Sequence, residues 1–366
     1  MSENPIRVLV VDDTVVYRKV VSDVLNELPG TEVVGVAHDG RIAMSKVAAL
    51  KPDLLTLDIE MPEMNGLEVL DRIRTEAPDT GAIMLSTLTH EGGEMTMKAL
   101  ELGAFDFIPK PETHSIDESK RAVKDALAPM LKAFARRKEL RSILRSRGMV
   151  YGKDRPTTPY GLVQRQTVTR ARREGKSQIV GIGISTGGPN ALAKMLPGLS
   201  EDLNVPIVIV QHMPAMFTRS LAKSLNAKCR LTVREAVDGE PLCPNTAFIA
   251  PGGKQMKLVA GVDGKSRIVR ITDDPPENNC KPSVDYLFRS IAHHYVGRAT
   301  GVIMTGMGTD GAEGLKMMKR SGALVIAQDE ISSTVYGMPR EAVNAGVVDI
   351  ISPLDRIAEE ISRTVR

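Results

Sequence analysis

Short apolar segments alternate with segments of helical periodicity over the first third of the chain. The apolar segments are nearly continuous, as expected for strands that are buried on both faces of a sheet. Helical patterns such as Tyr17–Leu28 and Gly66–Arg74 lie between them. Five βα repeats of this kind predict a parallel sheet covered by helices on both faces. The expected strands are Arg7–Val11, Val33–Ala37, Leu54–Leu57, Ala82–Ser86 and Phe105–Ile108.

A second βα series begins at Gln178. Its expected strands are Ile179–Ile184, Pro206–Val210, Ala247–Ala250, Thr300–Met304 and Leu324–Ala327. Its expected helices are Asn190–Leu196, Thr218–Asn226, Val284–His294, Ala312–Ser321 and Pro339–Ala345. Between Lys254 and Thr272, two β-like runs flank an Asp-Gly step, which is a hairpin signal. We therefore predict an α/β protein whose second half is a doubly wound parallel sheet with an antiparallel hairpin.

The two series are separated by a basic segment. Its first part, up to Arg147, is expected to be a helix that extends from the first domain, and the Gly-, Pro- and Thr-containing stretch after it lacks apolar periodicity. At roughly 100–200 residues per domain, the length corresponds to two or three domains. We predict a first domain at 1–125, a basic interdomain linker at 126–177 and a second domain at 178–366. A nucleic-acid-binding patch is the alternative for the linker. Without interleaved aromatic residues or a recognisable fold, we favour a solvated linker and no nucleic-acid partner.

Composition narrows the class of protein further. Hydrophobic residues make up 42% and charged residues 25% of the chain, which is ordinary for a globular protein. No run reaches the roughly 18 apolar residues of a membrane span, and the N-terminus does not have the pattern of a signal peptide. None of the three cysteines, Cys229, Cys243 and Cys280, forms a C-x-x-C pair. We expect a cytoplasmic protein without membrane insertion.

Three carboxylates follow strands of the first series. Asp12 and Asp13 end the first strand and Asp58 ends the third. Because the carboxyl ends of parallel strands meet at one edge of a sheet, these groups should lie together and need a cation such as Mg²⁺. Lys110 after the fifth strand, and Ser86 with Thr87 after the fourth, complete a site suited to phosphoryl transfer onto an aspartate. Helix caps and solvated turns are the alternative for each carboxylate taken alone.

The segments VLVVDD, LDIEMPEMNGLE and FIPKP resemble the receiver domain of two-component response regulators. The resemblance implies a flavodoxin-like (βα)5 fold over about the first 125 residues. It implies that Asp58 is phosphorylated by a histidine kinase, and that Asp13 and Asp58 hold Mg²⁺ together with the Glu60 carbonyl. Asp12 would act on the ion through water. The switch residues implied are Ser86, with Thr87 as the alternative, and Phe107. Lys110 supplies a fixed positive charge beside them.

Three residues of the second series indicate nucleophilic catalysis. Ser185 lies in a Gly-x-Ser-x-Gly turn after the first strand, His212 ends the second, and Asp310 follows the strand that ends at Met304. This set predicts a serine nucleophile, a general base and a carboxylate that orients the base. Helix caps and an edge histidine are the alternative for the single residues. The chain order of the three residues differs from that of α/β-hydrolases.

The glycine-rich turn at Ser185 has a second interpretation, which is a dinucleotide site. Such a site requires an acidic residue near the end of the next strand. Gln211 and His212 stand there instead, so we disfavour it.

The segments GISTGGP, QHMPAMFTRSLAKSL, APGGKQM, KPSVDYLFRSIA, GVIMTGMGTDGAEGL and QDEISSTVYGMPREA resemble the catalytic domain of chemotaxis protein-glutamate methylesterases. The resemblance implies that Ser185, His212 and Asp310 form a triad, with Thr186 and Met307 beside the reacting centre. It implies hydrolysis of glutamate methyl esters on chemoreceptors, with release of methanol, and deamidation of receptor glutamines. No cofactor is expected in this domain. The segment 275–280 departs from the family pattern, which leaves its contacts open.

The order of the two domains predicts regulation of the hydrolase by the receiver. We expect the receiver to cover the hydrolase cleft until Asp58 is phosphorylated, since phosphorylation adds about −1.5 to −2 charge. The alternatives are a receiver-controlled esterase or amidase with another substrate, and a non-catalytic binding regulator. A DNA-binding output would require a module such as a helix-turn-helix, and residues 178–366 show no such pattern.

Overall fold

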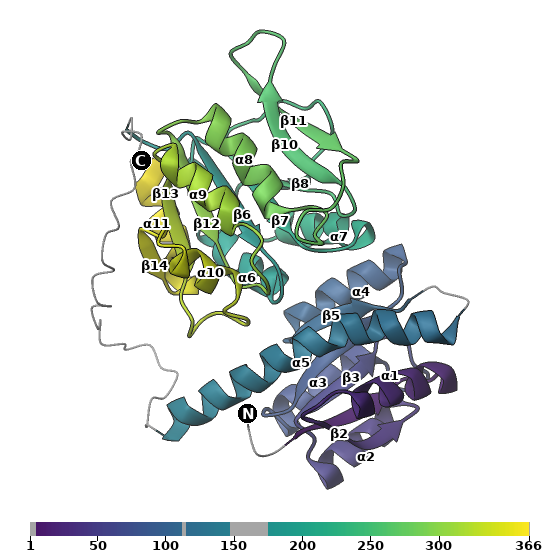
Figure 1. Ribbon diagram of the computed structural model, residues 1–366. Helices are drawn as coiled ribbons and strands as arrows, with labels where there is room; N and C mark the ends of the chain where they lie inside the picture. The colour runs from purple at the N-terminus through teal and green to yellow at the C-terminus, as the bar shows by residue number, and fades with distance from the viewer. Residues whose placement is uncertain (1–4, 112–114, 147–174, 366) are drawn as a thin grey trace. The chain divides into compact units, whose positions relative to one another are not determined.

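Each half of the chain is built on its own parallel sheet (Figure 1). The computed structural model describes residues 5–111, 115–146 and 175–365. These residues divide into two units, one for each of the two βα series. The α/β class predicted from the sequence is confirmed.

The first unit has a five-stranded parallel sheet in the order β2-β1-β3-β4-β5. This is the flavodoxin-like strand order, in which the carboxyl ends of β1 and β3 are adjacent. The central strands consist almost entirely of buried apolar side chains, which explains why each was recognisable in the sequence. The elements are β1 (Ile6–Val11), α1 (Val15–Glu27), β2 (Thr31–Ala37), α2 (Gly40–Leu50), β3 (Leu54–Asp58), α3 (Gly66–Glu76), β4 (Gly81–Ser86), α4 (His90–Glu101), β5 (Asp106–Pro109) and α5 (Ile116–Ser146).

Helix α5 packs on α1 and β5, and buries Leu127, Leu131 and Phe134. Three of its lysines form ion pairs with carboxylates of the same unit: Lys120–Asp23 at 2.6 Å, Lys124–Glu27 at 2.7 Å and Lys138–Asp53 at 2.6 Å. The predicted domain boundary at residue 125 lies inside this helix. The exact boundary between the first domain and the linker stays a prediction. Most of the predicted linker, residues 147–174, lies outside the described residues.

The second unit has a seven-stranded parallel sheet in the order β14-β13-β12-β6-β7-β9-β8. The central strand β6 comes first in the chain. Strands β7, β8 and β9 follow on one side of it, and β12, β13 and β14 then form the other side. The strand order therefore reverses beside β6, where doubly wound folds place their sites. The elements are β6 (Ile179–Ile184), α6 (Gly188–Met195), η1 (Leu196–Gly198), β7 (Ile207–Gln211), α7 (Ala215–Asn226), β8 (Thr232–Glu235), β9 (Thr246–Ile249), β10 (Gln255–Ala260), β11 (Arg267–Thr272), α8 (Val284–His294), β12 (Ala299–Ile303), α9 (Ala312–Arg320), β13 (Leu324–Gln328), α10 (Met338–Asn344), β14 (Ile350–Ser352), η2 (Leu354–Arg356) and α11 (Ile357–Val365).

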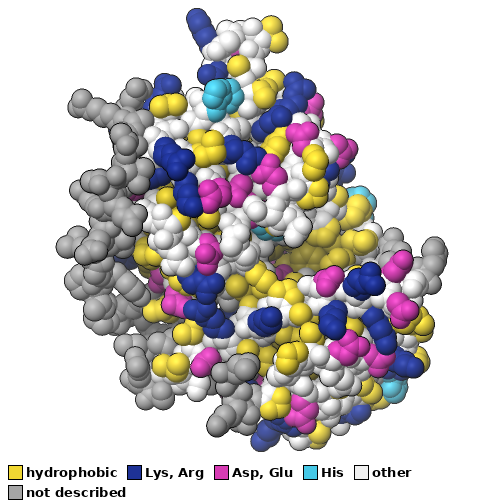
Figure 2. All heavy atoms as spheres, in the orientation of Figure 1, with side chains coloured by type: hydrophobic (Ala, Val, Ile, Leu, Met, Phe, Trp, Pro, Cys, Tyr) yellow, Lys and Arg dark blue, Asp and Glu magenta, His cyan; other side chains and the backbone are white. Residues whose placement is uncertain are grey.

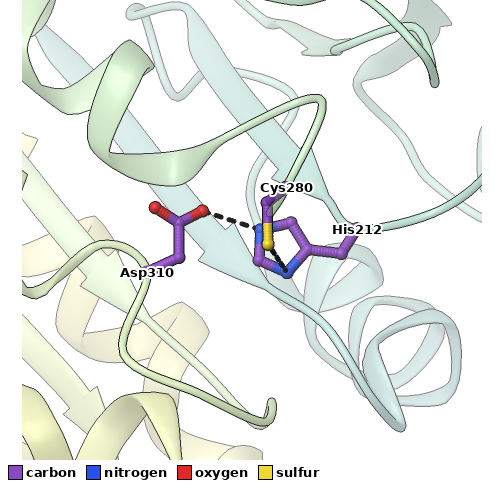
Figure 3. Close-up of side chains that lie close together, drawn as sticks. All are labelled: His212, Cys280 and Asp310. Atoms are coloured by element: carbon purple, nitrogen blue, oxygen red, sulfur yellow. Dashed lines mark hydrogen bonds and ion pairs between the residues drawn. The ribbon is translucent and has the colours of Figure 1, made fainter. Parts of the chain in front are cut away.

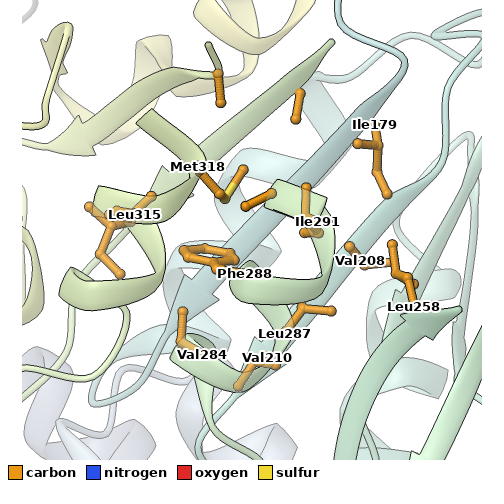
Figure 4. Close-up of a cluster of buried hydrophobic side chains, with 14 of the residues drawn as sticks. Ile179, Val208, Val210, Leu258, Val284, Leu287, Phe288, Ile291, Leu315 and Met318 are labelled. Carbon is orange, nitrogen blue, oxygen red and sulfur yellow. The ribbon is translucent and has the colours of Figure 1, made fainter. Parts of the chain in front are cut away.

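Helix α8 forms the centre of one core layer of this unit (Figure 4). Its residues Val284, Leu287, Phe288 and Ile291 are fully buried against the sheet, the hairpin and α9. The helix approaches β6 so closely that a Cβ at Gly181 would lie 2.5 Å from the Ile291 side chain. Removing the Phe288 ring would cost about 3–5 kcal/mol of stability. This packing fixes the N-terminus of α8, which becomes important at the site.

The predicted hairpin is present as β10 and β11, which pair antiparallel in a two-stranded sheet of their own. At its turn, the Asp263 carboxylate accepts hydrogen bonds from Lys265 and Ser266. The hairpin packs against α8. The sequence did not predict β8, β14 or α11. The two strands are edge strands of four and three residues, too short to give a clear apolar pattern.

Basic and acidic side chains are interspersed over the face of the molecule in Figure 2. Several form short-range ion pairs within one helix, such as Arg72–Glu76 and Lys316–Glu313. No helix among the described residues is both long enough and apolar enough to cross a membrane.

Candidate active site and acidic site

Three adjacent strands of the second unit bring Ser185, His212 and Asp310 to one edge of the sheet. β6 pairs with β7 on one side and with β12 on the other, all in parallel. Ser185 follows β6 and His212 follows β7, while Asp310 lies in the glycine-rich loop after β12. The sequence predicted this arrangement from strand ends alone.

His212 and Asp310 form a direct pair, with 2.8 Å between His212 Nε2 and Asp310 Oδ2 (Figure 3). The side chain of His212 is 14% exposed and that of Asp310 is 2% exposed. Burial lowers the pKa of His212, but hydrogen bonds with Asp310 and Cys280 outweigh burial and raise the pKa to about 9. Asp310 therefore stabilises the imidazolium form of its partner.

The Asp310 carboxylate lies at the N-terminus of α8, where backbone N–H groups point outward. Oδ1 accepts hydrogen bonds from Ser283 Oγ at 2.8 Å and from the Asp285 N–H at 3.1 Å, and Oδ2 accepts one from the Val284 N–H at 2.7 Å. Burial alone would raise the pKa of Asp310, but these donors and His212 lower it to about 2. The group is held as a permanent anion.

Two residues that the sequence did not predict, Cys280 and Asn278, also contact the pair. Cys280 Sγ lies 3.7 Å from His212 Nδ1, the ring nitrogen that Asp310 does not contact (Figure 3). Asn278 Nδ2 donates to Asp310 Oδ1 at 3.1 Å. Both belong to the segment 275–280, whose departure from the family pattern was the available signal. No local motif indicates their proximity, since they are 68 and 32 residues from their partners.

Hydrogen bonds to the backbone of Ser185 fix its position. Its N–H donates to the Thr305 carbonyl, and the Gln211 side chain donates to the Ser185 carbonyl, both at 3.0 Å. Thr305 Oγ1 donates to the carbonyl of Thr186, the residue after Ser185, and a Cβ at Gly306, the residue before Met307, would lie 2.8 Å from Ser185 Cβ. Gly306 is thus required for the loop after β12 to approach Ser185.

The hydroxyl of Ser185 makes no hydrogen bond with any described residue. Because Asp310 accepts a hydrogen bond from Nε2–H, the neutral imidazole of His212 carries its free lone pair on Nδ1. Nδ1 is also the nitrogen that Cys280 contacts. The ring is therefore oriented to accept a proton at Nδ1. In the described part of the chain, the backbone N–H groups of Thr186 and Met307 also make no hydrogen bond, so both can donate to a developing oxyanion.

The carboxyl ends of β1 and β3 form an acidic site in the first unit. Lys110 Nζ lies 2.9 Å from Asp12 Oδ2 and 2.7 Å from Asp58 Oδ2. Burial, reinforced by the neighbouring charge of Asp12, raises the pKa of Asp58 to about 6, although Lys110 opposes the shift. Gly66 at the start of α3 leaves no room for a Cβ, which would lie 2.1 Å from the Asp58 carbonyl oxygen.

The residues of the acidic site fit a divalent cation. Oxygen atoms of Asp12, Asp13 and Asp58 lie within 4.8 Å of one another. Asp12 Oδ2 is buried and forms an ion pair with Lys110 Nζ at 2.9 Å, while Asp13 is exposed. Hard carboxylate oxygens at this spacing suit Mg²⁺.

The remaining residues predicted in the first unit lie around this site. Ser86 is buried and accepts a hydrogen bond from Thr96 Oγ1 at 2.6 Å. Thr87 is half-buried, with its hydroxyl 3.3 Å from that of Thr89. Phe107 is buried, and Glu60 is exposed with its N–H 3.4 Å from Asp58 Oδ1.

Comparison with known proteins identifies both halves. Residues 8–119 match the family described as response regulator receiver domain, and residues 180–361 match the family described as CheB methylesterase. The protein-glutamate methylesterase/protein-glutamine glutaminase of Desulfotalea psychrophila is 54% identical, covering 99% of this chain and 99% of its own. That of Geobacillus kaustophilus is 44% identical, covering 98% and 99%. The crystal structure of the Thermotoga maritima CheB methylesterase catalytic domain covers 52% of this chain and 98% of that domain, at 39% identity and a TM-score of 0.50.

Proposed function

Because the chain belongs to the family of receiver-linked protein-glutamate methylesterases/protein-glutamine glutaminases, we propose that it hydrolyses glutamate methyl esters on chemoreceptors and deamidates receptor glutamines. The observation that carries the proposal is the buried His212–Asp310 pair at the same sheet edge as Ser185. The enzyme acts in the cytoplasm on methylated receptors, and a histidine kinase phosphorylates its receiver domain.

Ser185 is the nucleophile and His212 the general base. As the Ser185 oxygen attacks the ester or amide carbonyl, its proton passes to His212 Nδ1, the nitrogen opposite Asp310. Asp310 stabilises the resulting imidazolium, which then protonates the ester oxygen or amide nitrogen as its bond to the carbonyl carbon breaks, so that methanol or ammonia leaves. Water hydrolyses the acyl-enzyme in the second half of the reaction, with His212 again accepting a proton.

The oxyanion of each tetrahedral intermediate is stabilised by backbone N–H groups beside Ser185. Thr186 and Met307 supply these donors, because both N–H groups are unpaired within the described residues and flank the serine. Losing one such donor would raise the barrier by about 3 kcal/mol.

The receiver domain accepts a phosphoryl group on Asp58. Mg²⁺ would be held by Asp13, Asp58 and the Glu60 carbonyl, with Asp12 acting through water, and supplies charge neutralisation when bound. Lys110 lies 2.7 Å from Asp58 and adds a fixed positive charge to the site. The phosphoryl group biases Ser86 or Thr87, and Phe107, which releases the hydrolase from inhibition by the receiver.

The test is methanol release from a methylated chemoreceptor fragment, with and without a small phosphodonor and Mg²⁺. We expect release that rises with phosphodonor and disappears in Ser185→Ala, whose fold is checked by circular dichroism. Near-wild-type release in Ser185→Ala would overturn the assignment of the nucleophile. Absence of release from every receptor fragment, with Asp58 still phosphorylated, would overturn the substrate and leave a receiver-controlled hydrolase of another ester or amide.

A further inference from the structure

The side-chain amide of Asn278 bridges two buried carboxylates. Its Nδ2 donates to Asp285 Oδ2 at 2.9 Å and to Asp310 Oδ1 at 3.1 Å. Asp285 is 3% exposed and Asp310 is 2% exposed, so neither carboxylate is solvated by bulk water. A single amide with two N–H donors is the neutral group that can satisfy both acceptors.

The two carboxylates differ in how readily they ionise. Burial, together with the neighbouring charge of Asp310, raises the pKa of Asp285 to about 6, despite hydrogen bonds from the Gly314 N–H and Asn278. The pKa of Asp310 is lowered to about 2. Asp310, the carboxylate that contacts His212, therefore ionises at lower pH than Asp285.

The segment carrying Asn278 is fixed by several independent contacts. Glu277 and Cys280 form a β-bridge, Glu277 pairs with Arg289 of α8, and the Gln255 side chain donates to the Cys280 carbonyl at 3.4 Å. Asn278 and Asn279 have φ angles of 51° and 60°, the left-handed region that asparagine tolerates. The segment thus presents the Asn278 amide to the carboxylates and the Cys280 thiol to His212.

We propose that Asn278, with Asp285, is a positioning residue of the hydrolase, which keeps Asp310 oriented and ionised toward His212. The inference rests on the proposed hydrolase function and deepens it, since Asn278 acts through Asp310 and does not touch the reacting atoms. The charged and titratable groups that face this cluster are His212, Cys280, Asp285, Arg289, Glu277 and Asp310.

The chain offers a matched control in the next residue. Like Asn278, Asn279 is exposed and has a positive φ, but among the described residues its side chain makes no hydrogen bond to Asp285 or Asp310. Asn278→Asp replaces the donor with a third carboxylate at the bridge, and Asn279→Asp adds the same charge one residue away. Asn278→Gly and Asn279→Gly remove each amide without backbone strain, because glycine adopts positive φ freely.

Two readouts are measured in the full-length protein. In methanol release, Asn278→Asp should lower kcat roughly ten- to a hundredfold at unchanged KM, as expected for loss of a hydrogen bond to a charged group. The acid limb of its pH profile should move to higher pH, because added negative charge favours the imidazolium of His212. Asn278→Gly should lower kcat at unchanged KM, and both Asn279 variants should behave as wild type.

The second readout is the NMR titration of the His212 ring protons. Their signal is identified as the one that disappears in His212→Asn. Asn278→Asp should raise the His212 pKa, and Asn279→Asp should shift it by a small, screened amount. Equal shifts in the two variants, or unchanged kcat in both Asn278 variants, would overturn the inference. If wild type releases no methanol, the proposed function fails, while the His212 titration still decides whether Asn278 controls this pair.

Discussion

Asp58 and Asp310 are two buried carboxylates near the carboxyl ends of parallel strands, with opposite electrostatic surroundings. Asp58 is the last residue of β3, Asp310 lies in the loop after β12, and each is 2% exposed. The pKa of Asp58 is raised to about 6, by burial and by Asp12. That of Asp310 is lowered to about 2, because its hydrogen bonds outweigh burial.

The difference follows from what each oxygen contacts. Both oxygens of Asp310 are occupied, by the N-terminus of α8, Ser283, Asn278 and His212. Among the described residues, Asp58 is contacted by Lys110 and, at a longer distance, by the Glu60 N–H. The surroundings of Asp310 favour its anionic form, whereas Asp58 has fewer donors and retains oxygen lone pairs for a cation. This difference agrees with the proposed roles, in which Asp310 orients His212 and Asp58 accepts a phosphoryl group.

The largest effect is expected from Asp310→Asn, which leaves the shape of the site but removes the anion. The amide cannot hold the Nε2–H tautomer of His212 or stabilise the imidazolium, so kcat should fall about 10⁴-fold. Methanol release at saturating substrate measures this, with circular dichroism as the check on folding. A loss of less than tenfold would show that the carboxylate charge is not what distinguishes the two sites.

A near-complete loss is also expected from alkylation of Cys280. The His212–Asp310 pair lies next to a thiol, whereas the acidic site lies next to a lysine. Iodoacetamide would add a bulky group to Cys280, whose Sγ lies 3.7 Å from His212 Nδ1. Burial raises the pKa of Cys229 to about 11, so its thiolate is scarce at neutral pH. Cys280→Ser should resist inactivation, and Cys243→Ser, at an exposed cysteine, should not. Protection by Cys243→Ser instead would contradict the contact.

An intermediate effect is expected from Asp58→Asn, the counterpart of Asp310→Asn. Stimulation of methanol release by phosphodonor should vanish, while release without phosphodonor stays at the wild-type rate. The reason is that the proposed role of Asp58 is to accept the phosphoryl group and not to take part in hydrolysis. Stimulation that survives in Asp58→Asn would place the phosphoryl acceptor elsewhere.

The smallest effect concerns pH and His212. Because its folded pKa of about 9 exceeds the ordinary 6.5, its contribution to stability is complete below pH 6.5 and is lost as the pH rises through about 9. Activity should change in the opposite direction, since only the neutral imidazole can act as base. Urea unfolding and kcat/KM measured from pH 6 to pH 9.5 follow both. In His212→Asn this part of the stability change should be absent.

The sequence by itself determined both parallel sheets, the hairpin, and the strand ends at which the candidate residues lie. These features are local: a buried strand needs a continuous apolar run, and a hairpin turn needs its Asp-Gly step. Edge strands β8 and β14 escaped prediction because strands of three or four residues carry too little apolar pattern. The predicted boundaries at 125 and 177 and the predicted linker stay predictions.

Only the tertiary structure decided which nitrogen of His212 faces Asp310, and which groups surround the pair. Asn278, Cys280 and the N-terminus of α8 reach the site because α8 packs between the sheet and the hairpin, which no spacing in the sequence encodes. His212 and the backbone N–H groups of Val284 and Asp285 lower the pKa of Asp310 against the effect of burial, through hydrogen bonds made across the fold. Residue type is written in the sequence, but the ionisation of a buried residue depends on its neighbours in space.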